Sequence, residues 1–284
     1  MHRASSPLRP FAVAAALALC ALAPAARASQ LSDMLERKEM RCGTLADIPP
    51  FATPDPKTRE LAGFDVDMCR AVGKRLGVAV TLVPLSIEAR VPEVKMGRVD
   101  IAIANLFYTL GRAEQIQFSN AYYLAREVII ARASDPGTTK ADFKGKRLTA
   151  TKGSTSEIGI KQNQSEPLTF QDTGSAYLAF MQNKAVGMVS NPLTTAKLVK
   201  DAKAAGVELK VLMDDPLVVA PVAVGLKKDE PALLAAVNKA LGDMEKDGEI
   251  DAIWNKWLGP DTDYKIPRKE KVTPISELKF NPAP

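Results

Sequence analysis

Histidine is almost absent from this sequence. The chain has 284 residues and a single histidine, His2, which lies in a leader that we expect to be removed. Without it, no Ser-His-Asp or Cys-His catalytic arrangement and no histidine-ligated metal site can form. The remaining chain therefore lacks the common histidine-based mechanisms, and we predict that it uses no metal and no cofactor.

Long apolar runs and basic clusters are also lacking. The apolar stretch at residues 11–23 is shorter than the roughly 18 residues that a spanning helix needs, and no later segment approaches that length. The formal net charge is +5, and it falls to +2 (35 − 33) without residues 1–28, which hold three of the 38 Lys and Arg and none of the 33 Asp and Glu. No basic cluster with interleaved aromatic residues occurs, so we predict no nucleic-acid partner.

Residues 1–28 are typical of a secretory signal. Basic residues precede the apolar stretch, and Ala26 and Ala28 flank Arg27 in a small-x-small cleavage pattern. We therefore expect the mature chain to begin near Ser29 and to work outside the cytoplasm. At 256 residues (284 − 28), it is long enough for one or two domains with a sizeable core.

Cysteine is scarce as well, and the three cysteines leave alternatives open. Cys20 lies in the leader, where a lipoprotein site is conceivable in outline, but Leu19 is bulky where a small residue is expected before the cysteine. Cys42 falls in a strand-like run and Cys69 in a helix-like stretch. In a compartment that permits disulfides, these two form either a local bridge or two small buried thiols.

What the sequence does contain is an alternation of strands and helices. Periodicity predicts strands at Lys38–Thr44, Val78–Pro84 and Val99–Ala104, separated by helices at Val66–Leu76 and Glu88–Met96. A proline-rich loop occupies residues 46–59. This order is typical of parallel βαβ winding, so the fold class is α/β.

The alternation begins again in the second half of the chain. Further strands are predicted at Glu127–Ala131, Arg147–Thr151, Leu168–Phe170, Val186–Ser190, Val207–Met213 and Leu217–Leu226. Helices are predicted from about Thr155 and at Ser175–Asn183, and Pro231–Leu258 reads as helix broken near Asp247-Gly248. The tail at residues 260–284 is rich in proline and alternating charge, which favours a surface course or partial disorder.

Arg112 is the candidate for ligand recognition that stands out. It follows the apolar strand Val99–Ala104, and an arginine beyond the carboxyl end of a buried strand can hold an anion in its fork of N–H donors. The alternative is a surface arginine at a helix start. Residues 97–109 and 183–195 also echo each other, which sets Asn105 and Asn191 at matching strand ends, although any two βα units share some likeness.

The chain from Lys38 to Gly259 resembles the periplasmic solute-binding proteins of polar amino-acid ABC transporters, often called family 3. The resemblance rests on GFDVDMCRAVGKRLG at 63–77 and YTLGRAEQIQFS at 108–119, with CGTLADIPPF, DFKGKRLTATKGSTSE and DGEIDAIWNKWLG in family order. It implies a two-lobe periplasmic binding protein fold (type II) with two hinge crossovers and a ligand cleft. Lobe 1 would hold residues 29–131 and 222–284, and lobe 2 residues 132–221.

The resemblance also implies roles for individual residues. Arg112 falls where the family's arginine clamps a ligand carboxylate, and Asn105 and Phe107 fall where backbone groups reach the ligand. In lobe 2, Ser154 and Thr155 fall where a helix N-terminus grips the same carboxylate.

The ammonium side of the pocket departs from the family pattern. Asn191 stands where an aspartate is usual, and Phe107 where a serine or threonine is usual. Leu45, Ile48 and Ile87 replace acidic or aromatic residues, so the expected pocket is unusually apolar. The ligand is then either an amino acid or another organic carboxylate, unless Asp47 or Glu88 turns inward to restore the negative charge.

The predicted function is that of a monomeric periplasmic solute-binding protein. It would capture a small carboxylate-bearing solute by hinge closure and deliver it to the membrane permease of an ABC transporter. Relatives on the same fold include a periplasmic dehydratase, but the groups available for such chemistry, Glu88, Asp47 and Lys152, form no paired arrangement. We therefore predict that the protein is not an enzyme, with a dehydratase-like enzyme as the alternative. A sensory module is a third class, disfavoured because no kinase-like or spanning segment follows.

Overall fold

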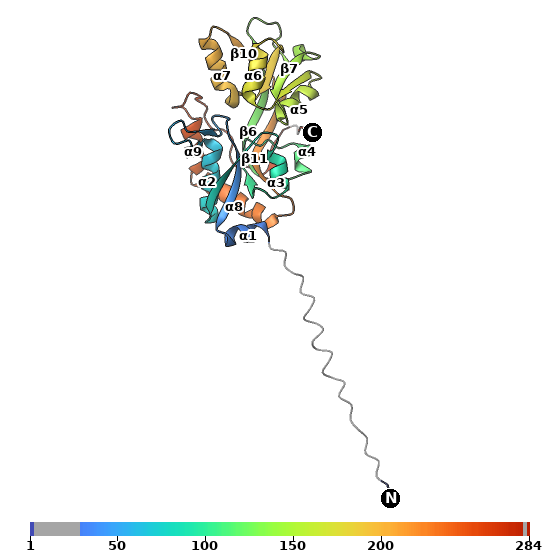
Figure 1. The fold of residues 1–284 in the computed structure, drawn as a ribbon, viewed down its shortest axis with the longest axis vertical. Coiled ribbons are helices and arrows are strands. Elements are labelled where there is room, and N and C mark those ends of the chain that lie inside the picture. The colour runs from blue at the N-terminus through green and yellow to red at the C-terminus, as the bar shows by residue number, and fades with distance from the viewer. Residues whose placement is uncertain (3–28, 281–282) are drawn as a thin grey trace.

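The computed structural model describes residues 1–2, 29–280 and 283–284 (Figure 1). All but the first two residues of the predicted leader 1–28, including Cys20, lie outside the described residues. In the described part, no helix has the length and apolarity needed to cross a membrane.

The lower lobe in Figure 1 is built around a mixed sheet. Its strands run in the order β4 (Ala79–Leu85), β1 (Glu39–Leu45), β5 (Ile101–Ala102), β11 (Val218–Leu226) and the first part of β6 (Gln117–Arg132). β1 is parallel to β4 and β5, whereas β11 is antiparallel to β5 and β6. A small hairpin of β2 (Thr53–Pro54) and β3 (Leu61–Ala62) lies apart from this sheet.

The upper lobe uses the far end of the same strand β6. Residues Val128–Ala131 of β6 pair with β9 (Gly187–Ser190), and its last residues pair with β10 (Leu209–Val211). β7 (Arg147–Thr151) and β8 (Glu166–Phe170) complete this part of the sheet in parallel pairing. β6 therefore passes from one lobe into the other, and the fold is the predicted two-lobe α/β architecture.

Helices cover the strands of each lobe (Figure 1). Around the lower lobe lie α1 (Gln30–Glu36), α2 (Phe64–Leu76), α3 (Arg90–Lys95), α4 (Leu110–Ala113), α8 (Pro231–Lys246) and α9 (Glu249–Trp257). The upper lobe carries α5 (Thr155–Gln162), α6 (Thr173–Met181), α7 (Pro192–Ala204) and the 3₁₀ turn η1 (Lys140–Phe143). A second 3₁₀ turn, η2 (Ile275–Glu277), lies in the tail.

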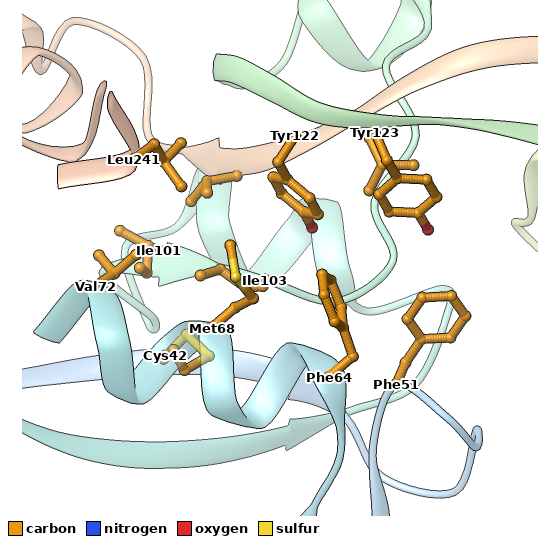
Figure 2. Packing of buried hydrophobic residues seen from close by; sticks show 14 of the residues in the cluster. Cys42, Phe51, Phe64, Met68, Val72, Ile101, Ile103, Tyr122, Tyr123 and Leu241 are labelled. Atoms are coloured by element: carbon orange, nitrogen blue, oxygen red, sulfur yellow. A yellow bond between two sulfur atoms is a disulfide. The ribbon is translucent and has the colours of Figure 1, made fainter. Parts of the chain in front are cut away.

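The core of the lower lobe forms between α2 and β6. Helix α2 ends at Gly77, whose φ of 72° is the left-handed conformation that favours glycine at a helix end. Figure 2 shows Tyr122 and Tyr123 pointing from β6 toward Phe64 and Phe51, and the Phe64 and Tyr122 ring centroids lie 6.1 Å apart. These aromatic side chains belong to one buried cluster of the lower lobe, and they support the end of β6 that leads to the upper lobe.

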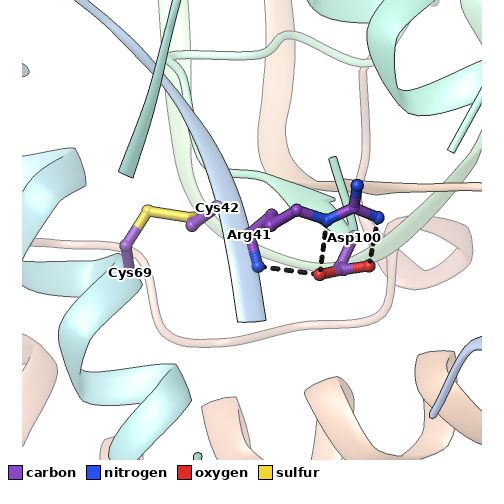
Figure 3. The surroundings of a disulfide bond; sticks show 4 residues. All are labelled: Arg41, Cys42, Cys69 and Asp100. Atoms are coloured by element: carbon purple, nitrogen blue, oxygen red, sulfur yellow. Dashed lines mark hydrogen bonds and ion pairs between the residues drawn. A yellow bond between two sulfur atoms is a disulfide. The ribbon is translucent and has the colours of Figure 1, made fainter. Parts of the chain in front are cut away.

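The Cys42–Cys69 bridge is formed, which resolves the alternative left open by the sequence. It links β1 to α2 with a sequence separation of 27 residues (Figure 3). Beside it, the buried Asp100 accepts hydrogen bonds from the Arg41 backbone N–H at 2.7 Å and from the Arg41 guanidinium at 3.2 Å. Arg37 also donates to Asp100. β1 is thus held to α2 by a covalent bond and to the segment before β5 by the ion pair with the buried Asp100.

The proline-rich tail lies over the lower lobe, one of the two courses expected from sequence. Arg268 pairs with Glu245 at 2.6 Å and with Asp251 at 2.8 Å, and the Ile266 carbonyl accepts from the indole of Trp254 at 2.8 Å. Thr273 forms an isolated antiparallel bridge with Ala121 at the start of β6. Trp254 is buried.

Two predicted strands have other bounds in the structure, and helix α7 was not predicted. β6 extends over Gln117–Arg132 rather than Glu127–Ala131, since its first half mixes polar and aromatic residues that face different neighbours. β5 contains only Ile101–Ala102, because the chain turns away soon after at Asn105, whose φ is 45°. Helix α7 was missed, although Asn191 caps it and Pro192 begins it. The lobe limits at 131/132 and 221/222 stay a prediction.

Candidate functional site

A cavity of about 30 Å³, room for about two water molecules, lies between the lobes. The lower lobe lines it with Leu45, Ile48, Ile87, Arg90, Asn105 and Phe107, and β6 contributes Glu127. The upper lobe lines it with Thr151, Ser154, Thr155, Ser156, Thr173, Ser190, Asn191 and Thr194. Seven of the eight predicted ligand-binding residues therefore surround one cavity, and the eighth, Arg112, lies directly behind it.

Arg112 ties the two lobes together at this cavity. Helix α4 begins after Thr109, whose hydroxyl accepts a hydrogen bond from the Arg112 backbone N–H at 3.2 Å. The guanidinium donates to the Phe107 carbonyl at 2.8 Å in one lobe, and to the Thr155 hydroxyl at 3.2 Å and the Gly153 carbonyl at 3.1 Å in the other. Burial lowers the pKa of Arg112 to about 10, an effect that Glu127 partly opposes, so the group stays cationic at neutral pH.

The N-terminus of α5 lies in contact with Arg112 beside the cavity. Ser154 caps this helix, because its hydroxyl accepts from the Glu157 backbone N–H at 3.2 Å while it donates to the Thr151 carbonyl. The first N–H groups of any helix have no partner within the helix and favour an anion. The arrangement can therefore hold a carboxylate between a guanidinium and a helix terminus.

Asn105 and Phe107 shape the lower wall. Asn105 adopts the left-handed conformation, and its side-chain carbonyl accepts a hydrogen bond from the Tyr123 hydroxyl. Phe107 forms an isolated antiparallel bridge with Val222 of β11 and is buried. Together with Ile48 and Ile87, which line the cavity as predicted, they make this wall largely apolar.

Asn191 lines the cavity from the upper lobe. It caps helix α7, and its side-chain carbonyl accepts a hydrogen bond from the Leu193 backbone N–H at 2.9 Å. Its amide nitrogen is buried and makes no hydrogen bond to the described residues. The sequence interpretation made Asn191 an acceptor for an ammonium group, but its carbonyl already accepts the hydrogen bond of the helix cap.

Arg90 is a wall residue that the sequence analysis missed. Its guanidinium donates to the Ile87 carbonyl at 3.0 Å and, through Nη1, to the Ala104 and Asn105 carbonyls at 2.8 Å each. Burial and the nearby charge of Arg112 together lower its pKa to about 9. Arg90 thus fixes the turn after β5 while adding positive charge to the cavity. In sequence it is one arginine at a helix start, with no pattern to distinguish it.

Glu127 is the second missed residue. It lies on β6 where the strand passes between the lobes, and only 3% of it is exposed. One oxygen accepts a hydrogen bond from the Ser156 hydroxyl at 2.6 Å. Burial raises the pKa of Glu127 to about 7, against the opposing effects of Ser156, Arg112 and Arg90. A signal was present, since a single acidic residue opens the apolar run EVIIA at 127–131.

Neither Asp47 nor Glu88 restores the negative charge that Asn191 lacks. Asp47 is exposed, and neither side chain lines the cavity. Glu88 pairs instead with Lys152 of the upper lobe at 3.0 Å, with both side chains about half exposed. This ion pair joins the two lobes beside the cavity, so the possibility left open by the sequence, that Asp47 or Glu88 turns inward, is not realised in the structure.

Residues 40–260 match the family described as bacterial extracellular solute-binding proteins, family 3. The chain belongs to this family. Among its relatives, the lysine/arginine/ornithine-binding periplasmic protein of Escherichia coli strain K12 is 30% identical over 235 residues, which cover 77% of this chain and 87% of that protein. The histidine-binding periplasmic protein of Salmonella typhimurium strain LT2 is 28% identical over 237 residues, with coverage of 78% and 88%.

Solved structures of this family 3 fold superpose on the chain. An ancestral arginine-binding protein bound to arginine has a TM-score of 0.70 and 30% identity, covering 78% of this chain and 99% of that one. The ancestral amino acid-binding protein AncCDT-1, a precursor of cyclohexadienyl dehydratase, has a TM-score of 0.71 and 29% identity, with coverage of 82% and 100%. The family and the two-lobe fold predicted from sequence are confirmed.

Proposed function

We propose that this family 3 protein is the periplasmic binding component of an ABC importer. It captures an amino acid or a related organic carboxylate between its lobes and delivers it to the membrane permease. The observation that carries the proposal is that Arg112 contacts both lobes at the cavity. Relatives named for binding lysine, arginine, ornithine or histidine support the solute class.

Capture follows from the contacts that hold the lobes together. When the lobes part, Arg112 loses Thr155 and Gly153 as partners, and its N–H groups become available to a ligand carboxylate. When the lobes close on the ligand, the carboxylate takes the place between Arg112 and the N-terminus of α5. The hydrogen bonds formed there join a guanidinium to a carboxylate, and they are stronger than the hydrogen bonds to a neutral hydroxyl and carbonyl that they replace. Ligand binding therefore favours the closed form.

A dehydratase-like activity is the second candidate, and Glu127 is the observation that favours it. A buried carboxyl group with a pKa of about 7 is suited to donating a proton at neutral pH. Of the described residues that line the cavity, Glu127 is the one carboxyl group, and none is a histidine. A single acid without a matched base supports binding rather than turnover.

The function is tested with Arg112→Ala and with Arg70→Ala as the matched control, since Arg70 is an exposed arginine outside the cavity. Wild-type protein is screened by thermal shift against the twenty L-amino acids and a set of organic acids. A ligand at 100 times its dissociation constant adds about 2.7 kcal/mol to the free energy of unfolding.

We expect Arg112→Ala to weaken the best ligand at least tenfold in calorimetry, while Arg70→Ala binds as wild type does. Undiminished affinity in Arg112→Ala would refute the assignment of the cleft. Release of a dehydrated product from any hit would favour the enzyme instead.

A further inference from the structure

Glu127 is a buried carboxyl group that lacks a cationic partner. It is almost fully buried, and it accepts one hydrogen bond, from Ser156. Across residues 29–280, no lysine or arginine comes within ion-pair distance of it, although its pKa senses both Arg90 and Arg112. Both arginines instead donate their hydrogen bonds to carbonyl groups or hydroxyls.

An unpaired buried carboxylate is costly. Such a group is therefore either protonated in the folded protein or paired with the cation of a bound ligand. Removing a carboxylate from water costs several kcal/mol unless a partner compensates. A carboxyl group with a pKa near 7 is half ionised at neutral pH, and an arriving cation shifts it to the ionised form. Because Glu127 lines the cavity, that cation can come from a ligand.

The charges around the cavity are also complementary to the two ends of a zwitterion. Arg112 and the N-terminus of α5 form an anion-binding end, while Glu127 supplies the only negative charge among the described lining residues. Asn191 supplies no charge, and its side-chain carbonyl already accepts the hydrogen bond that caps α7. Glu127, rather than the residue that stands in place of an aspartate, is therefore the group that can pair with an ammonium group.

We propose that Glu127 binds the ammonium group of the ligand, so that the site selects amino acids over organic acids that lack an amino group. This inference rests on the proposed function and names its substrate class. Glu127 lies on β6, the strand shared by both lobes, so it reaches the ligand from the hinge side, and its link to Ser156 orients it when the lobes are closed. The apolar wall of Ile48, Ile87 and Phe107 then receives the ligand's side chain.

Glu127→Gln tests the proposal because it keeps the shape and an acceptor for Ser156 but removes the charge. The matched control is Glu166→Gln, an exposed glutamate of the upper lobe. The probes are the best-binding L-amino acid of the twenty and the acid that lacks only its α-amino group. We expect Glu127→Gln to weaken the amino acid at least tenfold, and the des-amino acid to bind wild type and Glu127→Gln equally weakly.

Either of two results overturns the inference: an amino acid that binds Glu127→Gln as tightly as wild type, or a des-amino acid that binds wild type as tightly as the amino acid does. The second comparison needs no variant, so it holds even if Glu127→Gln fails to fold. Arg112→Ala separates the two levels of the argument. If it loses the ligand while Glu127→Gln does not, the inference fails and the proposed function stands. If neither variant loses it, the cleft itself is wrongly assigned.

Discussion

Arg112, Arg90 and Glu127 show how differently a charge can be used within one cavity. Arg112 contacts both lobes through three hydrogen bonds, whereas Arg90 donates its hydrogen bonds to carbonyl groups of the turn after β5. Glu127 keeps one oxygen free of hydrogen bonds to the described residues. Residue type alone therefore does not tell which charge supports the fold and which is available to a ligand.

Sequence identified Arg112 as a candidate because motif and position agreed, whereas the single acidic residue that opens the apolar run 127–131 did not show that Glu127 is buried at the cavity. Whether a glutamate in a strand is buried depends on what packs against both faces of the sheet. Here Ser156 arrives from the other lobe, 29 residues further along the chain, and covers it. That proximity is set by the path of the chain between the lobes, which local periodicity does not encode.

Asp100 is expected to control stability at acid pH. Burial alone would raise its pKa, but hydrogen bonds from Arg41 and Arg37 outweigh burial, so its pKa in the folded protein lies below the usual 3.8. A lowered pKa contributes stability above the unfolded value, and this contribution is lost as the pH falls below about 4. Asp100→Asn should therefore lower the free energy of unfolding at pH 7 by about 1.5–3 kcal/mol, the usual contribution of hydrogen bonds to a charged group, because Arg37 and Arg41 are each about one-third exposed and solvent screens the pair.

Urea unfolding of Asp100→Asn and wild type between pH 3 and pH 7 checks this. The difference in the free energy of unfolding between the two proteins should become smaller toward pH 3. Asp201→Asn, which removes an exposed helical pair with Lys197, serves as the control and should stay close to wild type. A difference in the free energy of unfolding that stays constant with pH would contradict the lowered pKa of Asp100.

At the scale of elements, the strands and helices with a simple environment were predictable. The predicted strand Arg147–Thr151 coincides with β7, and the break near Asp247-Gly248 separates α8 from α9. The extent of β6 was not predictable, since its two ends belong to different lobes and its exposed and buried positions follow no single alternation. Local pattern thus identifies elements that face one core and fails for the strand that serves two.

The disulfide is expected to contribute strongly to the stability of the lower lobe. By the chain-entropy estimate, a bridge with a separation of 27 residues adds about 3.5 kcal/mol to the free energy of unfolding. In a chain of this size, that corresponds to a Tm lowered by about 7–14 °C when the bridge is removed. The decrease in Tm is measured by calorimetric scans of three samples: wild type, wild type with reductant, and the double variant Cys42→Ala/Cys69→Ala.

Reduced wild type separates the loss of the bridge from the loss of packing, because both cysteines are fully buried and alanine leaves small cavities. The reduced protein should show most of the decrease in Tm. Equal Tm values with and without the bridge would show that it does not contribute to stability.

At the scale of the whole molecule, the Lys152–Glu88 pair beside the cavity biases the lobes toward closure. An ion pair this exposed contributes at most about 1 kcal/mol. Glu88→Lys replaces attraction by repulsion, so in the absence of ligand the ratio of open to closed form should rise roughly two- to fivefold, and ligand affinity should fall by at most that factor. Small-angle X-ray scattering at low salt reads the change as an increased radius of gyration.

The charge swap Glu88→Lys/Lys152→Glu should return the radius of gyration to the wild-type value, since it restores attraction with the signs exchanged. Raising the salt concentration should reduce the difference between Glu88→Lys and wild type, because exposed charges are screened. A swap variant that stays open would mean that the pair does not bias closure.

The tail has a practical consequence through its contact with α4. The backbone N–H of Leu110 donates to the Ala283 carbonyl at 2.8 Å, and Gly111 lies beside Pro284. The last residues therefore rest on the short helix that carries Arg112. An affinity tag or fluorophore fused after Pro284 would be attached within one helical turn of the binding arginine, so measurements of ligand affinity are better made with such additions placed before Ser29, beside α1.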